Sequence, residues 1–246
     1  FGWLVFDVLA CGGHALMEDG GMFFAGGTRF AVPTVMRNGT CGTDRKDILS
    51  PLYALGLSYA VKLAPKPVSA SEDTWSLIPQ NMVGQGATKT IEPGVRWYPT
   101  VTRLANGKML VTGGFDYVLP WDIAQPNRSI EVYDPSHTQW TLLSSHEQSP
   151  EEIFNRDYTH VFQLPRKITR ANYQYDLLMF GEAGVPAFMA ISPSVRWSVS
   201  NRRRPGSLTG QQPNYGTSTT LLPLRVIDGE WGYANGSVMM AGGNHD

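Results

Sequence analysis

The chain has 246 residues, of which 42% are hydrophobic and 17% charged, so it can bury a substantial core. Its 20 basic and 21 acidic residues give a formal net charge of -1, so no overall field favours nucleic acid or an anionic membrane. The 26 glycines, 17 prolines, seven Trp, ten Tyr and ten Phe favour many short strands and tight turns. The sequence therefore predicts an all-β protein, and no apolar run approaches the ~20 residues that a membrane span needs.

The first residues, FGWLVFDVLACGG, lack both a start Met and a signal-peptide pattern, so we expect that the chain is cut at its front. The two cysteines, Cys11 and Cys41, allow one disulfide, and this count is consistent with an oxidising or a reducing compartment. Three glycosylation acceptors begin at Asn38, Asn127 and Asn235, and they favour a secreted or extracellular protein.

One phrase recurs along the chain: an alternating apolar stretch, a turn, a short apolar strand and a glycine pair. The clearest copies are Cys11–Gly27 (CGGHALMEDGGMFFAGG) and Tyr98–Gly114 (YPTVTRLANGKMLVTGG). The third copy begins at Tyr158 and the fourth at Tyr215, each with an insertion in its hairpin loop. Each copy predicts a β-hairpin, with two-residue turns at Asp19-Gly20, Asn106-Gly107 and Asn235-Gly236.

Further strands are expected between the copies. Residues 58–78 and 129–143 each predict an outer hairpin, with Trp75 in the role of Trp140. Four strands per unit and a period near ~50 residues are typical of a kelch β-propeller, of which about four blades are visible. Residues 28–56 are too long for a connecting loop and are interpreted as a surface insertion, with a short helical turn at Arg45–Leu49.

Three phrases carry a resemblance to a known family. The segment CGGHALMEDGGMFFAGGTR resembles the cysteine-bearing blade of the galactose oxidase and glyoxal oxidase family of copper radical oxidases. RWYPTVTRLANGKMLVTGG resembles the next blade, and NYGTSTTLLPL (Asn214–Leu224) a later one. The resemblance covers nearly the whole chain and implies a partial propeller, residues 1–246, of a seven-bladed domain whose C-terminal β-sandwich partner lies outside this sequence.

The resemblance also implies a cofactor. In that family the cysteine is joined by a thioether to the tyrosine of the following blade, which also binds copper, and these roles carry over to Cys11 and Tyr98. Such a site oxidises an aldehyde, a primary alcohol or a carbohydrate and passes the electrons to O2, which gives H2O2. Arg156 resembles a substrate-contacting arginine of galactose oxidase.

This sequence departs from the family in three respects. The remaining copper ligands of the family, a Tyr-His pair and a histidine of the β-sandwich, do not occur in these 246 residues, and none of the five histidines directly follows a tyrosine. Asp116, eighteen residues after Tyr98, stands where galactose oxidase has a tryptophan over the thioether. The aspartate argues against galactose oxidase itself.

The residues also have structural interpretations. Cys11 is a candidate small buried hydrophobe or a disulfide partner of Cys41, and Tyr98 a residue that packs the central channel. His14 is interpreted as a core histidine, and His160 as a structural residue on the face of Tyr158.

Two functions therefore remain open. One is part of a copper radical oxidase resembling glyoxal oxidase, with the other copper ligands outside the chain. The alternative is a non-catalytic kelch-like extracellular binding or structural propeller, which applies if the chain has its natural length. In both cases we expect residues 1–246 to need the rest of the propeller or a partner chain, because an incomplete ring exposes blade faces.

Overall fold

The structure is a computed structural model built almost entirely of strands. It describes residues 2–9, 11–34, 36–37, 40–41, 53–66, 72–86, 92–118, 125–150, 159–170, 173–180, 186–191, 195–199, 218–221 and 238–241. Within these ranges the single helical element is a short 3-10 turn, η1 (His146–Gln148). This confirms the predicted all-β class.

Three four-stranded antiparallel sheets form successive blades. The first contains β2 (Gly13–Leu16), β3 (Met22–Ala25), β8 (Ala60–Ala64) and β9 (Thr74–Leu77). The second contains β10 (Thr100–Arg103), β11 (Met109–Thr112), β13 (Ile130–Asp134) and β14 (Gln139–Ser144). The third contains β15 (His160–Arg170), β16 (Tyr173–Phe180), β17 (Pro186–Ala190) and β18 (Arg196–Val199). A two-stranded sheet, β19 (Ser218–Leu221) and β20 (Val238–Ala241), follows.

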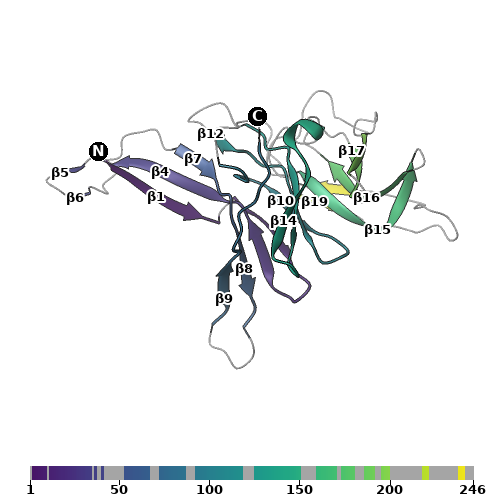
Figure 1. Cartoon of the computed structure of the whole chain (residues 1–246), viewed down its shortest axis with the longest axis horizontal. Coiled ribbons are helices and arrows are strands. Elements are labelled where there is room, and N and C mark those ends of the chain that lie inside the picture. Colours follow the sequence, from purple (N-terminus) through teal and green to yellow (C-terminus); the bar gives the residue numbers. More distant parts are fainter. Residues whose placement is uncertain are drawn as a thin grey trace.

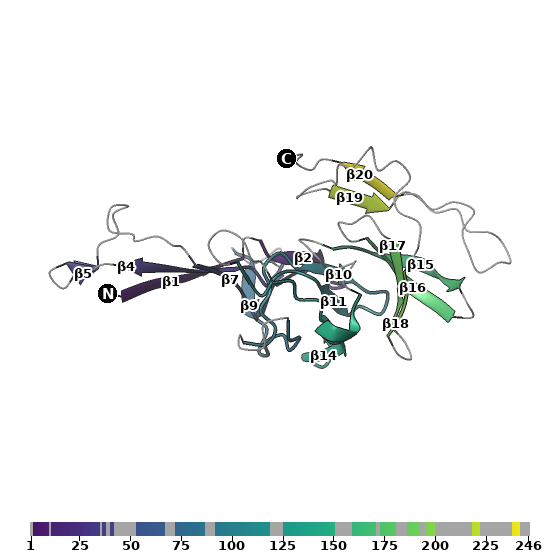
Figure 2. The same cartoon turned by 90° about the horizontal axis from the view of Figure 1, so that it is seen from above.

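The blades follow one another side by side. Strand β10 contacts β2 of the blade before it and β15 of the blade after it, so the first strands of the three blades are neighbours. Figure 2 shows this order from β2 through β10 to β15, with β19 and β20 above them in that view. Four-stranded sheets packed in this sequence are blades of a β-propeller, as the repeat predicted.

Apolar side chains fill the space between blades. One buried cluster joins the first and second blades and includes Phe23, Tyr133 and Trp140. A second cluster joins the second and third blades and includes Leu110 and Leu177. Because successive side chains of a strand point to opposite faces, β11 contributes Met109 and Val111 to the first cluster and Leu110 to the second.

The predicted hairpins form, but their turns are longer than two residues. Met17 N donates to Gly21 O at 2.7 Å, and Leu104 N donates to Lys108 O at 2.8 Å, so three residues lie in each loop. Gly20 and Gly107 have φ of 82° and 79°, whereas Asp19 and Asn106 do not have positive φ. A type I turn followed by a left-handed glycine has this pattern, so the two-residue prediction is wrong at both loops. The Asn235-Gly236 turn lies outside the described residues.

The third repeat uses its inserted residues as strand. β15 and β16 pair from His160–Phe180 to Arg170–Tyr173, with a register shift between Gln163 and Ile168. The hairpin is therefore lengthened, and the extra residues do not form the loop insertion that we expected.

A fourth four-stranded sheet lies beside the blades. It contains β1 (Gly2–Val8), β4 (Thr28–Thr34), β7 (Tyr53–Gly56) and β12 (Tyr117–Val118). β1 and β4 project from the body as an arm (Figure 1), with β5 (Met36–Arg37) and β6 (Thr40–Cys41) at its end. Strands β4 to β7 come from residues 28–56, the expected surface insertion, whose predicted helical turn at Arg45–Leu49 lies outside the described residues.

Candidate functional site

Cys11 and Tyr98 lie next to each other at the beginnings of the first two blades. The Tyr98 amide N donates to the Cys11 carbonyl O at 2.8 Å, and each residue stands two positions before an innermost strand, β2 or β10. The residues that the family resemblance pairs are thus in direct backbone contact. Both are half-buried.

Both residues also have an unusual backbone conformation. φ is 66° at Cys11 and 58° at Tyr98, and Thr138 is the one further non-glycine residue with positive φ in the described ranges. The left-handed region costs a residue with a Cβ ~1–2 kcal/mol. Strained conformations of this kind concentrate at functional sites, where the surrounding structure holds them in place.

Close packing holds the segment 96–99 against the first blade. A Cβ on Gly13 would lie 2.5 Å from the Pro99 carbonyl O, and a Cβ on Gly26 would lie 2.6 Å from the Arg96 carbonyl O. Distances below 3 Å are not tolerated between such atoms. Glycine at positions 13 and 26 therefore allows the second blade to approach Cys11 this closely.

The ring of Trp97 is in contact with that of Tyr98. The two ring centroids are 4.1 Å apart at an interplanar angle of 50°. Trp97 is itself fixed, because its Nε1 donates to Thr28 Oγ1 at 2.9 Å and its backbone exchanges two hydrogen bonds with Phe115, at 2.8 and 2.7 Å. The segment that follows Gly113 and Gly114 therefore runs beside the segment that contains Tyr98.

Asp116 lies in that neighbouring segment and is buried, with 2% of its surface exposed. Its carboxylate is packed against Gly86, where a Cβ would lie 1.9 Å from Oδ1. The side chain at the position of the family's tryptophan is thus a buried acid near the backbone of Trp97 and Phe115.

A buried ion pair that no sequence pattern predicts supports this site. Arg96 and Glu131 have no exposed side-chain surface, and Arg96 Nη2 lies 2.7 Å from Glu131 Oε1. The Arg96 guanidinium also donates to the Gly113 O at 2.7 Å and the Ser129 O at 2.9 Å. Glu131 Oε2 accepts hydrogen bonds from the amides of Val83 and Gly84. The pair ties four chain segments together two residues before Tyr98.

Asn127 belongs to the same network. Its side chain is fully buried, and Nδ2 donates to the carbonyls of Gly84 and Val95, both at 3.2 Å. A glycan on this buried side chain would not fit within the fold, so we do not expect Asn127 to carry one. Asn38 and Asn235 lie outside the described residues, and secretion stays a prediction.

The other predicted residues fall in several places. Arg156 lies outside the described residues. His14 is exposed and its ring lies 5.8 Å from that of Phe24, so its interpretation as a core histidine is wrong. His160 begins β15 and is half-buried. Cys11 is a free thiol in the described part of the chain and not a disulfide partner.

Copper binding by Tyr98 stays a prediction. Within the ranges that the structure covers, no three His, Cys, Asp or Glu residues gather as a metal-binding group. The same ranges contain no helix long and apolar enough to cross a membrane.

Comparisons with known proteins agree on the fold. Residues 97–146, which form the second blade with Trp97 and Tyr98, match the Kelch motif. The solved structure of YjhT is similar with a TM-score of 0.50 and 12% identity, over 85% of this chain and 57% of that chain. A fungal alcohol oxidase of the AA5 family, solved in complex with copper, aligns with a TM-score of 0.36 and 15% identity over 81% of this chain and 43% of that chain. No curated protein sequence is significantly similar to this chain.

These findings define the class of protein. The blades, their order and the Kelch motif make the chain a kelch-like β-propeller segment. It spans 57% of the length of the YjhT structure, and at 12% identity that likeness concerns the fold alone.

Proposed function

We propose that this chain is part of a copper radical oxidase resembling glyoxal oxidase, which oxidises aldehydes or primary alcohols with O2 and releases H2O2. The observation that carries the proposal is the backbone hydrogen bond between Tyr98 and Cys11, both in the left-handed conformation. Secretion to an oxidising, copper-containing compartment is part of the same proposal.

The described residues suit one half of such a site. Cys11 supplies a thiol and Tyr98 a phenol, and their backbones are in contact. A thioether forms when Sγ bonds to a ring carbon of Tyr98, with loss of the S–H and one ring C–H hydrogen. The two electrons and two protons released reduce O2 to H2O2. Under this proposal the ligands other than Tyr98 come from outside the described residues.

Each side chain has a distinct role in the proposed chemistry. A sulfur bonded to the Tyr98 ring makes the phenol easier to oxidise, because the sulfur shares the unpaired electron. The Trp97 ring contacts the Tyr98 ring, with their centroids 4.1 Å apart, and so limits how the phenol can reorient. Copper, when bound, would supply the second one-electron acceptor for a two-electron oxidation.

The alternative is a non-catalytic kelch-like extracellular propeller that binds a ligand or serves as a structural scaffold. Asp116, a buried acid where galactose oxidase has a tryptophan, fits this alternative as well as it fits a resemblance to glyoxal oxidases, in which this position varies. Under this alternative, Cys11 stays a free thiol and Tyr98 packs the channel.

Peptide mapping of the full-length natural protein under reducing conditions separates the two. The oxidase proposal predicts a Cys11 peptide covalently joined to the Tyr98 peptide, with a mass lower by two hydrogens than the sum. Cys11→Ser abolishes this species, and the control Cys41→Ser leaves it intact. A separate Cys11 peptide with a reactive thiol in copper-loaded protein refutes the oxidase and favours the scaffold. Copper-dependent peroxide release with methylglyoxal or a primary alcohol is the second readout.

A further inference from the structure

Trp97 and Tyr98 place two easily oxidised rings in contact with each other. Indole and phenol are the aromatic side-chain groups that lose an electron most readily. The two ring centroids are 4.1 Å apart, and both residues are half-buried. An electron can pass between rings that touch without any group in between. The contact itself requires neither copper nor a bond to Cys11.

The Trp97 indole also has an acceptor for its proton. Nε1 of an indole is a donor only, and here it donates to Thr28 Oγ1 at 2.9 Å. An indole that has lost an electron is a strong acid, so its N–H proton moves readily to a hydrogen-bonded acceptor. The neutral indolyl radical that remains is a stronger oxidant than a phenoxyl radical. Oxidation of Trp97 therefore leaves an oxidant in contact with the Tyr98 ring.

A second tryptophan–tyrosine pair in the same blades is enclosed. The rings of Tyr133 and Trp140 have centroids 5.2 Å apart, and the two residues are 3% and 6% exposed. They belong to the apolar cluster between the first and second blades. An oxidant in solution has little access to this pair. Trp97 and Tyr98 are thus distinguished from it by their accessibility.

We propose that Trp97 is an electron-transfer residue, which passes a one-electron oxidation from an outer-sphere oxidant in solution to Tyr98. The oxidant takes one electron from the Trp97 indole, and the N–H proton leaves to Thr28 Oγ1. The indolyl radical then takes one electron and one proton, which the Tyr98 phenol gives up. In sum, Tyr98 loses one electron and one proton, the oxidant gains the electron, and Trp97 is restored.

This inference deepens the proposed function and rests on it for its biological use, because a radical oxidase is active only with an oxidised phenol. The transfer of the electron, in contrast, requires only the two rings. Its test therefore uses a protein without copper in which Cys11→Ser prevents the thioether with Tyr98. Failure of the electron transfer and failure of the oxidase proposal are then separate results.

Radical trapping in the full-length natural protein with Cys11→Ser tests the proposal. A photogenerated ruthenium(III) polypyridyl complex serves as the one-electron oxidant, a nitroso spin trap captures tyrosyl radicals, and peptide mass spectrometry quantifies the adduct at Tyr98. We expect Trp97→Phe to lower this adduct several-fold, because phenylalanine is not oxidised by such a complex. Trp97→Tyr, which carries an oxidisable ring of similar size, should restore part of it.

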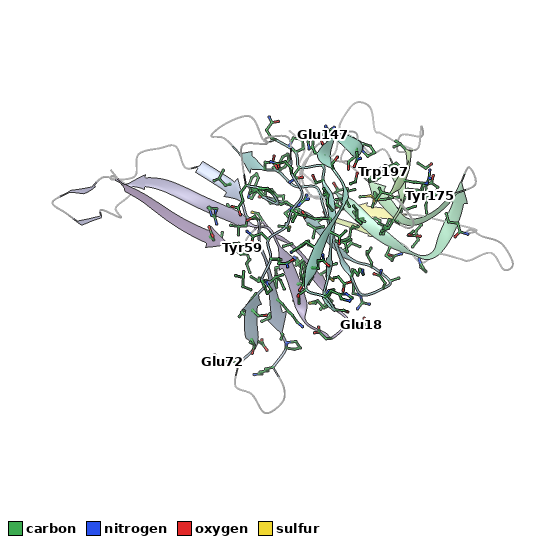
Figure 3. All side chains as sticks on the ribbon, in the orientation of Figure 1. Glu18, Tyr59, Glu72, Glu147, Tyr175 and Trp197 are labelled. Atoms are coloured by element: carbon green, nitrogen blue, oxygen red, sulfur yellow. The ribbon has the colours of Figure 1, made fainter. Side chains whose placement is uncertain are left out.

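Two controls come from the same protein. Trp140→Phe removes the enclosed indole and should leave the adduct at Tyr98 unchanged. Tyr59 is half-buried like Tyr98, but it is hydrogen-bonded to Asp7, and Figure 3 places it where the arm meets the blades. Its adduct measures direct oxidation of a tyrosine and should be equal in all variants.

Three results would overturn the proposal. One is an unchanged Tyr98 adduct in Trp97→Phe. Another is an equal loss in Trp97→Phe and Trp97→Tyr, because Trp97 then acts through packing alone. Thr28→Val provides the third measurement, which stays available if a Trp97 variant does not fold. It keeps both rings and removes the proton acceptor, so we expect a smaller adduct than in the parent, and an unchanged adduct contradicts the proposed path.

Discussion

Arg96 and Glu131 form an ion pair in which neither side chain has exposed surface. Taking two charges out of water is costly, and here the cost is offset by hydrogen bonds to Gly113, Ser129, Val83 and Gly84. Removal of one partner leaves the other charge buried and uncompensated. The pair therefore matters mainly for keeping the segment before Tyr98 in place.

We expect Arg96→Met to lower the free energy of unfolding by ~3–5 kcal/mol, because Glu131 then loses its only charged partner in the described core. The control is Arg29→Met, since Arg29 pairs with Asp7 at the surface with 35% of its side chain exposed. The control should cost at most ~1 kcal/mol. Denaturant titration measures the free energy of unfolding of both variants. Equal losses would show that the buried ion pair contributes no more stability than the surface pair.

Because the backbone of Cys11 is left-handed, we expect replacement by glycine to cost less stability than replacement by alanine. Glycine accepts a φ of 66° without a steric penalty, so Cys11→Gly should be more stable than Cys11→Ala by ~1 kcal/mol. Ala15→Gly, in the regular strand β2, is the control and should be destabilising by ~0.5–1 kcal/mol. Equal stability of the two Cys11 variants would mean that the left-handed conformation is not retained.

Some residues of the site were predictable and others were not. The family resemblance predicted a thioether between Cys11 and Tyr98; the two backbones are in contact at 2.8 Å, and the thioether stays a prediction. Arg96 and Glu131 are separated by 35 positions, and each sits in an ordinary polar context in the sequence. No local pattern distinguishes a fully buried arginine from an exposed one, so the pair appears only when the fold brings its segments together. For the same reason, the sequence does not show that Asn127 is buried.

At the scale of the elements, hairpins were the most predictable part of the molecule. Asp19-Gly20 and Asn106-Gly107 mark the turns correctly, and only the number of loop residues differs. The sheet of β1, β4, β7 and β12 was not anticipated, because its strands come from widely separated parts of the chain. Pairing over such distances depends on the neighbouring blades and leaves no short-range signal.

The β13–β14 hairpin contains a carboxylate that links it to the preceding β10–β11 hairpin. Lys108 Nζ lies 2.8 Å from Asp134 Oδ2, and the His137 ring and the Ser136 amide also contact the carboxyl group. The Lys108 hydrogen bond is the main cause that holds the pKa of Asp134 well below its usual range. The folded protein therefore binds the Asp134 proton more weakly than the unfolded chain does.

This pKa shift predicts an acid-dependent stability. A lowered folded-state pKa contributes stability above the unfolded value of about 3.9, and that contribution is lost as pH falls further. We expect the melting temperature to fall more steeply below about pH 4 in the parent protein than in Asp134→Asn. Lys108→Met, which removes the main partner of the Asp134 carboxylate, should lose the steeper slope as well. Parallel curves for the parent and Asp134→Asn would exclude a stabilising role of the Lys108 contact.

At the scale of the whole molecule, stability comes from the apolar side chains that are buried between blades. The first and second blades bury Phe23, Met109 and Trp140 together, and the second and third bury Leu110 and Leu177. Each blade needs a neighbour on both faces, because both faces of its strands are apolar. The first blade has such a neighbour on one face, and its other face carries Trp75 at 56% exposure.

We therefore expect the polypeptide of residues 1–246 to be marginally stable by itself. Leu16, Trp75 and Leu77 are exposed, and burial of each such side chain would stabilise the protein by ~1.5–3 kcal/mol. The sum is a large part of the usual stability of a domain. Calorimetry with sedimentation analysis should give a broad, low-temperature transition or self-association. The full-length natural protein is the comparison and should unfold at a higher temperature. A single cooperative transition of monomeric 1–246 at high temperature would show that the described interfaces between blades suffice for a stable fold, even with Leu16, Trp75 and Leu77 exposed.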